Sequence, residues 1–151
     1  MTKHAMLRDR LIGRWRLAAY EAFGPAGELF HPVGERAVGI IAYDAAGFVS
    51  VHIMDPGRAP FSGGDLAEAG DAEFAAAARG YFAYYGRFVV DEAAQTVTHQ
   101  LEMCLVPNWV GAAQLRHATL EGDRLVLSGG PVRIGGMDRI LKVSWVREPG
   151  Q

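Results

Sequence analysis

Short runs of alternating or continuous apolar residues, separated by compact turn signals, recur along almost the whole chain. Runs of this length and spacing predict β-strands, and eight can be placed. The predicted strands cover residues 15–21, 37–43, 48–54, 84–90, 96–105, 113–120, 124–128 and 139–147. Turns such as residues 44–47 and 121–123 are short enough to join antiparallel neighbours. We therefore expect an all-β fold, an eight-stranded up-and-down antiparallel barrel whose closure removes exposed edges.

One long insertion interrupts this pattern between the third and fourth predicted strands. Residues 55–64 are rich in Pro and Gly and predict a loop, whereas the Ala-rich residues 71–79 predict a helix with Asp71 as its N-cap. A short helical turn is also predicted at residues 5–11. We expect the inserted helix to lie over one barrel end. It is either a lid over a ligand entrance or a plug in the base, and the sequence favours neither.

Composition narrows the class of protein further. The chain has 151 residues, half of them hydrophobic, which fits one domain over residues 1–151 with a single core. The formal net charge is −2 and the Lys and Arg residues are scattered, so nucleic acid is not an expected partner. Cys104 is the sole cysteine, and neither an apolar leader nor a membrane-spanning run is visible. These features predict a cytoplasmic protein without a membrane partner.

The histidines and glycines give no sign of a metal or cofactor. The five histidines lack the paired spacing of a zinc or iron site. The glycines at 129–130 and 135–136 lack the Lys-Ser/Thr that completes a phosphate-binding loop. We expect no metal and no cofactor.

Four motifs in a fixed order carry a resemblance to a known family. They are Gly13-Arg14-Trp15, Tyr84-Tyr85-Gly86, Pro107-Asn108-Trp109-Val110-Gly111 followed by Arg116, and Trp145-Val146-Arg147. Over about residues 11–147 the chain resembles the bacterial and fungal lipocalin-like domain family. The resemblance implies a calycin-type β-barrel of this size, in a family some of whose members accompany secondary-metabolite pathways. It does not by itself imply an activity, because one fold supports many functions.

The resemblance also implies a structural role for the first tryptophan. In such barrels it packs across the closed end, beneath a cation from the last strand. Here that tryptophan is Trp15, and the cation is Arg147, with Arg139 or Lys142 as alternatives. We expect this pair to stabilise the fold and to take no part in chemistry.

Strand alternation points two polar side chains into the barrel. One face of the fifth predicted strand carries Val97, His99, Leu101, Met103 and Leu105, and one face of the sixth carries Gln114, Arg116, Ala118 and Leu120. The first face is mainly apolar, so His99 is predicted to point inward. Leu120, together with the pattern of the family that the chain resembles, favours an inward Arg116 as well. A buried arginine needs a partner. That partner is either an anionic or polar group of a ligand, or Glu35, Glu102 or a loop carbonyl acting as scaffold.

Aromatic residues complete the candidate site. Tyr84 and Phe88 share one face of the fourth predicted strand, Tyr43 ends the second, and Trp109 lies in a loop at the rim. The predicted ligand-binding residues are therefore Tyr43, Tyr84, Phe88, His99, Trp109 and Arg116. Aromatic walls with a few polar groups are typical of a pocket for a small apolar or amphipathic molecule.

Three functions fit this site. The first is a binding protein for a largely apolar molecule with a polar or anionic group. The second is a cofactor-independent isomerase, cyclase or dehydratase acting on a polyketide-like or terpenoid-like substrate, with His99 as the general acid/base. In that enzyme His99 needs a near-neutral pKa, and Arg116 and Tyr84 stabilise developing negative charge. The third is a structural barrel with a filled interior that forms a homodimer.

Overall fold

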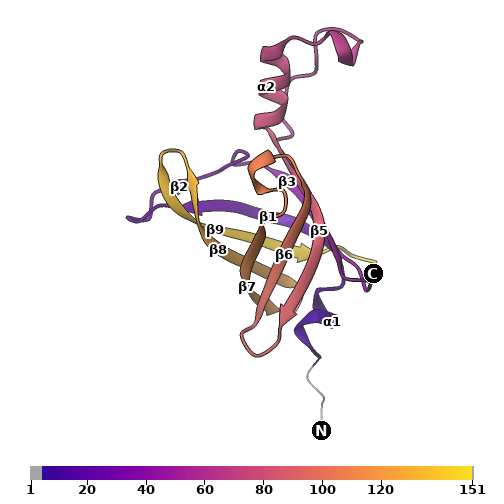
Figure 1. Ribbon diagram of the computed structural model, residues 1–151, viewed down its shortest axis with the longest axis vertical. Helices are drawn as coiled ribbons and strands as arrows, with labels where there is room; N and C mark the ends of the chain where they lie inside the picture. Colours follow the sequence, from indigo (N-terminus) through magenta and orange to yellow (C-terminus); the bar gives the residue numbers. More distant parts are fainter. Residues whose placement is uncertain (1–4, 151) are drawn as a thin grey trace.

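The computed structural model describes residues 5–150, which form a closed antiparallel β-barrel (Figure 1). Its strands are β1 (Gly13–Phe23), β2 (Leu29–Phe30), β3 (Val38–Tyr43), β4 (Phe48–Met54), β5 (Tyr81–Asp91), β6 (Thr96–Cys104), β7 (Ala113–Glu121), β8 (Arg124–Ile134) and β9 (Met137–Arg147). From β3 to β9 each strand pairs with its successor, and β1 pairs with both β3 and β9. The predicted eight-stranded up-and-down barrel is confirmed. The additional strand β2 pairs only with the end of β1.

The strands are longer than predicted where glycines interrupt the apolar pattern. The seventh predicted strand ends at residue 128, whereas β8 continues to Ile134. It does so through a register shift between Gly129 and Val132 in its pairing with β9. Past Ser128 only β9 is paired with β8, because the pairing between β7 and β8 ends at His117 and Ser128. The two strands therefore separate at this end of the barrel.

The opposite end is closed around Trp15. The helix α1 (Leu7–Leu11) buries Leu7 and Leu11 there, and the Trp15 indole N–H donates to the Leu11 carbonyl at 2.9 Å. The guanidinium of Arg147 lies 4.1 Å from the centre of the Trp15 ring, as expected for the last-strand cation. Of the two alternatives, Arg139 lies over Phe30 instead, and Lys142 does not lie over the Trp15 ring. At this closed end, α1 and the start of β1 are therefore in contact with the last strand, β9.

The inserted helix does not cover the barrel. The helix α2 (Asp71–Arg79) has the predicted bounds, but Gly70 is its N-cap and the Asp71 side chain makes no capping hydrogen bond. None of its residues is buried, and Figure 1 shows it standing out beyond the strand ends together with the turn η1 (Leu66–Glu68). The expectation that it lies over a barrel end is wrong. Its large apolar side chain, Phe74, packs against Phe61 of the same insertion, at 5.3 Å between ring centres.

Two β-bulges change which side chains face inward. The register of β1 against β9 shifts between Leu17 and Ala19, and beyond that point Tyr20 points into the core. A second shift lies between Tyr85 and Gly86 in the pairing of β5 with β6. It exchanges the inward-facing and outward-facing positions at the end of β6. Met103 and Leu105, predicted to face inward, are therefore 60% and 42% exposed.

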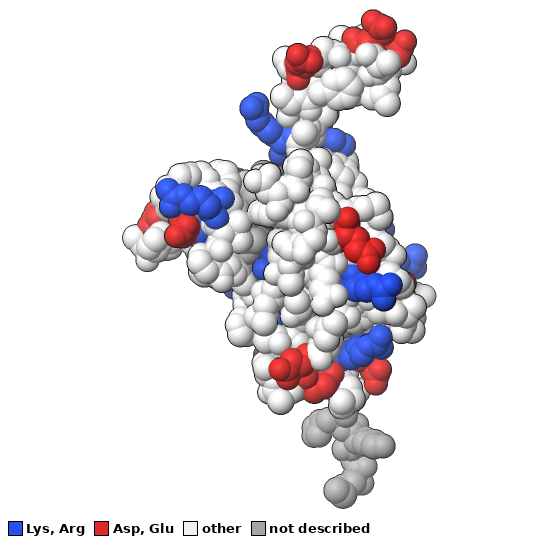
Figure 2. All heavy atoms as spheres, in the orientation of Figure 1, with Lys and Arg blue, Asp and Glu red and all other residues white. Residues whose placement is uncertain are grey.

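The surface has no broad basic area on the face shown in Figure 2, where charges of both signs are scattered. Acidic groups lie on the projecting insertion in that view. Within residues 5–150 no helix is both long and apolar enough to cross a membrane.

Candidate functional site

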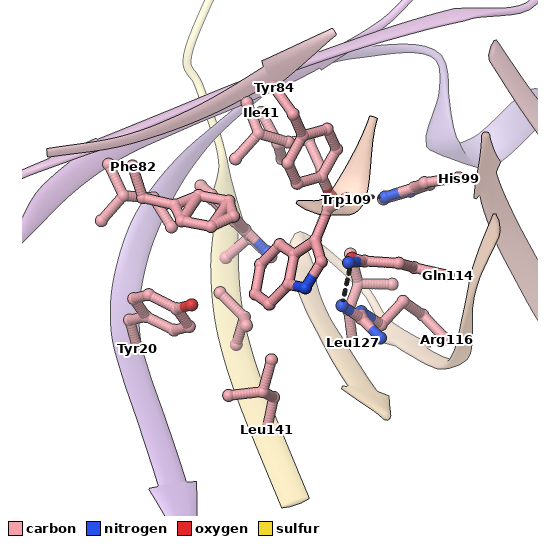
Figure 3. A pocket seen from close by; sticks show the side chains of 14 residues that line it. Tyr20, Ile41, Phe82, Tyr84, His99, Trp109, Gln114, Arg116, Leu127 and Leu141 are labelled. Carbon is pink, nitrogen blue, oxygen red and sulfur yellow. Dashed lines mark hydrogen bonds between the residues drawn. The ribbon is translucent and has the colours of Figure 1, made fainter. Parts of the chain in front are cut away.

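A cavity of about 30 Å³ lies inside the barrel. Strands β3, β4, β8 and β9 supply much of its apolar wall, through residues such as Ile41, Val51, Leu127 and Leu141. Strands β5, β6 and β7 supply a polar side formed by Tyr84, His99, Gln114 and Arg116 (Figure 3). The cavity is therefore amphipathic, and these four polar side chains lie on three neighbouring strands.

His99 is held on both ring nitrogens. Its side chain is fully buried on β6, with Nε2 at 2.7 Å from the Tyr43 hydroxyl and Nδ1 at 2.6 Å from the Tyr84 hydroxyl. Burial, and to a smaller extent the charge of Arg116, lowers the pKa of His99 to about 3. The near-neutral pKa expected from the sequence is wrong, because an imidazolium inside this cavity would be desolvated next to a guanidinium. His99 is thus a neutral imidazole at physiological pH.

The tyrosines beside His99 are also neutral. Burial raises the pKa of Tyr20 to about 12 and raises the pKa values of Tyr43 and Tyr84 above their usual range. Since the remaining lining residues are uncharged types, the Arg116 guanidinium is the one formal charge among the described residues that line the cavity.

Arg116 lacks a carboxylate partner. It is 7% exposed, and its Nη2 donates to Gln114 Oε1 at 2.6 Å. Its Nη1 donates to the Leu115 carbonyl at 3.3 Å, an oxygen at the edge of β7 where β8 has separated. No carboxylate of residues 5–150 lies within 4.0 Å of the guanidinium. Its hydrogen bonds are therefore made to neutral oxygens, and its charge stays uncompensated.

The scaffold carboxylates predicted as partners of Arg116 do not serve that role. Glu102 lies 3.3 Å from Arg87 on the outside of the barrel, and Glu35 makes no ion pair with Arg116. Space for the guanidinium comes from Gly129 on β8. A Cβ atom at this position would lie 2.7 Å from Arg116 Nη1.

Trp109 lies between the cavity and the surface of the barrel. It is half-buried at the end of the turn η2 (Pro107–Trp109), and Figure 3 shows its indole pointing among the cavity walls. Its ring centre lies 5.7 Å from that of Phe82. Trp109 also lines an outer groove of about 460 Å³ where β7 and β8 separate. Gln114 and Arg116 line both spaces, so the groove adjoins the polar side of the cavity.

Comparison with known proteins identifies the family. Residues 12–147 match the family model described as a lipocalin-like domain. The chain belongs to this family. A curated relative from the fungus Aspergillus oryzae is 36% identical over 108 residues, which span 67% of this chain and 97% of the relative. Its name is 4'-hydroxy-3'-methoxypropiophenone carrier protein.

The lipocalin-like domain brings four of the six predicted ligand-binding residues to the cavity. These are Tyr84, His99, Trp109 and Arg116. Tyr43 and Phe88 do not line it: Tyr43 is behind His99, and the Phe88 ring packs against Tyr43 at 4.8 Å between centres. They belong to the layer of side chains that supports His99.

Sequence reasoning did not assign Tyr20, Phe82, Gln114 and Trp145 to the site, although all four line the cavity. Strand alternation from Tyr84 and Arg116 could have found Phe82 and Gln114, which are two residues away on the same faces. Tyr20 could not be found this way because of the bulge in β1. Among residues 5–150 no cluster of His, Cys, Asp or Glu is suited to hold a metal ion.

Proposed function

We propose that this lipocalin-like domain binds a small, largely apolar molecule that carries a polar or anionic group, inside the barrel and without converting it. The observation that carries the proposal is the buried Arg116 guanidinium, which faces an otherwise neutral cavity without a carboxylate partner. A buried charge in this state is costly, and an oxygen of a ligand would offset that cost. The carrier named for an aryl ketone in Aspergillus oryzae supports this class of ligand.

The state of His99 favours binding over catalysis. A general base works best with a pKa near the operating pH, whereas burial holds the pKa of His99 at about 3. Both of its ring nitrogens are already within hydrogen-bond distance of tyrosine hydroxyls. His99 is therefore better suited to organise hydrogen bonds than to accept a proton from a substrate.

The volume of the cavity favours the filled, dimerising barrel as a second candidate. A space of about 30 Å³ holds water rather than an aromatic ring, and small-molecule pockets usually measure about 300–1,000 Å³. A ligand therefore fits only if lining side chains move, and Trp109 is the candidate because every other lining residue lies in a β-strand. Trp109 lies on a half-exposed turn beside the outer groove, so binding requires movement of a loop rather than of the barrel strands.

Calorimetric titration with 4'-hydroxy-3'-methoxypropiophenone tests the proposal. We expect the wild-type protein to bind it, and Arg116→Leu to weaken binding by about tenfold or more, since hydrogen bonds to charged groups contribute about 1.5–3 kcal/mol. Arg116→Lys keeps the charge and should lose less. The matched control is Arg87→Leu, which removes an arginine that is exposed on the outer face of β5. Thermal unfolding of each variant shows that the barrel remains folded.

Trp109→Ala separates the two candidates. Under the binding proposal this variant binds the same ligand at least as fast as the wild type, because the entrance is already open, and chromatography recovers the ligand unchanged. If neither protein binds it, the binding proposal fails for this ligand class. A stable dimer in sedimentation experiments would then support the filled barrel. Conversion of the ligand by the wild-type protein would contradict both.

A further inference from the structure

The hydrogen bonds that link Tyr43, His99 and Tyr84 have a defined order of donors and acceptors. A neutral imidazole offers one N–H and one lone pair, so it can donate to only one of the two hydroxyls that hold it. One tyrosine must donate to His99 and the other must accept from it. The accepting tyrosine keeps its own hydroxyl proton for another partner.

Burial decides which tyrosine accepts. Tyr43 is 2% exposed and packs edge-on against Phe88, and within residues 5–150 His99 is its hydroxyl's hydrogen-bond partner. If Tyr43 accepted from His99, its own O–H would be buried without an acceptor, which is unfavourable. Tyr84 instead lines the cavity, where its O–H can meet a ligand. The favoured order is therefore Tyr43 O–H to Nε2, and Nδ1–H to the Tyr84 oxygen.

We propose that Tyr43 and His99 are positioning residues that fix the Tyr84 hydroxyl as a hydrogen-bond donor to the ligand. The barrel then selects molecules whose polar group is an acceptor oxygen, such as a ketone carbonyl. This inference rests on the proposed ligand site in the barrel. It adds the hydrogen-bonding polarity of that site, which is set by His99 in the cavity wall and by Tyr43 behind it.

The other polar groups around the cavity agree with an acceptor ligand. The indole N–H of Trp145, a lining residue that is 2% exposed, has no partner among the described residues. Gln114 gives its oxygen to Arg116, which leaves its amide protons available. Arg116 can only donate. Tyr20 is the exception among these lining groups, since its hydroxyl can donate or accept.

The direction can be tested without a ligand. In protein labelled with ¹⁵N-histidine, the ring nitrogen shifts distinguish the two tautomers, and the His99→Gln variant assigns the signals of His99. We expect the Nδ1–H tautomer in the wild-type protein at neutral pH. In Tyr43→Phe, which removes the donor to Nε2, we expect a mixture of tautomers. An Nε2–H tautomer in the wild-type protein would overturn the proposal.

A pair of probes tests the selection. Propiophenone and propylbenzene differ only in that a carbonyl replaces a methylene, and we expect the wild-type protein to prefer the ketone by about fivefold. Tyr84→Phe should remove much of this preference, leaving the part that other donors such as Arg116 supply, and Tyr43→Phe should reduce it less although Tyr43 does not line the cavity. The control is Tyr85→Phe, because Tyr85 stacks on Phe48 and does not line the cavity. It should keep the wild-type preference.

The outcomes separate this inference from the proposed function. If both probes bind equally well to the wild-type protein, the barrel is a binding site but the donor role of Tyr84 is refuted. If neither probe binds, either to the wild-type protein or to Trp109→Ala, the binding proposal and the ligand selection both fall. A preference that is undiminished in Tyr84→Phe would refute the donor role of Tyr84 and assign it to another lining group.

Discussion

At the scale of single residues, the lowered pKa of His99 makes the free energy of unfolding depend on pH. The folded protein keeps it neutral with a pKa of about 3, whereas the ordinary value is 6.5. Because the unfolded chain takes up a proton at a higher pH than the folded one, His99 stabilises the fold fully above pH 6.5. That contribution is lost progressively as the pH falls from 6.5 towards 3.

We therefore predict a difference in pH dependence between the wild-type protein and His99→Gln, which cannot titrate at this position. Below pH 6.5 the free energy of unfolding of the wild type should fall more steeply, by up to about 1.4 kcal/mol per pH unit. Urea unfolding of both proteins between about pH 4.5 and 7.5 measures it. Parallel curves would show that His99 is not held neutral.

Gly129 is a second residue whose effect can be predicted. A Cβ there would lie 2.7 Å from both Arg116 Nη1 and the Leu115 carbonyl oxygen. Gly129→Ala should therefore push the guanidinium aside and weaken ligand binding in the same direction as Arg116→Leu. Calorimetric titration is the measurement, with Gly122→Ala as a contrast. Gly122 has a positive φ of 60°, so its substitution strains a turn without approaching Arg116. A Gly129→Ala protein with wild-type affinity would contradict the assigned role of Arg116.

At the scale of elements, the bulge between β5 and β6 depends on Gly86. A Cβ on Gly86 would lie 1.9 Å from the Gln100 carbonyl oxygen, too close for any side chain. We expect Gly86→Ala to disturb the pairing that places Tyr84 next to His99. It should lower the free energy of unfolding by about 1–3 kcal/mol. Urea unfolding measures the loss, and a variant as stable as the wild type would show that the strands can separate here without cost.

The insertion between β4 and β5 is expected to be dispensable for the barrel. Its ends are already adjacent, since the Asp55 N–H donates to the Gly80 carbonyl at 2.8 Å, and α2 buries none of its residues. Replacing residues 56–79 by a short Gly-Ser turn should change the free energy of unfolding by no more than about 1 kcal/mol. Ligand titration should also be unchanged. A large loss of affinity would show that the insertion closes over the site after all.

At the scale of the whole molecule, the seam between β1 and β9 closes the barrel. Trp15 is buried beneath the Arg147 guanidinium, which also donates to the Ile12 carbonyl. A double-mutant cycle with Trp15→Phe and Arg147→Met should give a coupling free energy of about 0.5–2 kcal/mol. Urea unfolding of the wild type, the two single variants and the double variant measures this coupling free energy. Strictly additive effects would mean that the ring and the cation do not stabilise each other.

Much of the fold followed from local signals along the chain. Alternating apolar residues and short turns predicted the closing strands, and the Ala-rich stretch predicted the bounds of α2. The same alternation placed His99 on an inward face, and Leu120 with the family pattern did so for Arg116; both residues are buried. These features could be read because a strand's period of two and a helix's propensity are properties of neighbouring residues.

The sequence by itself thus determined an all-β barrel of the lipocalin-like kind, with a histidine and an arginine inside it. Only the tertiary structure decided that Tyr43 and Tyr84 hold the two nitrogens of His99, that Arg116 meets Gln114 rather than a glutamate, and that the insertion stands clear. These outcomes depend on bulges, register and desolvation. Each arises between strands that are distant along the chain, so no local pattern encodes it.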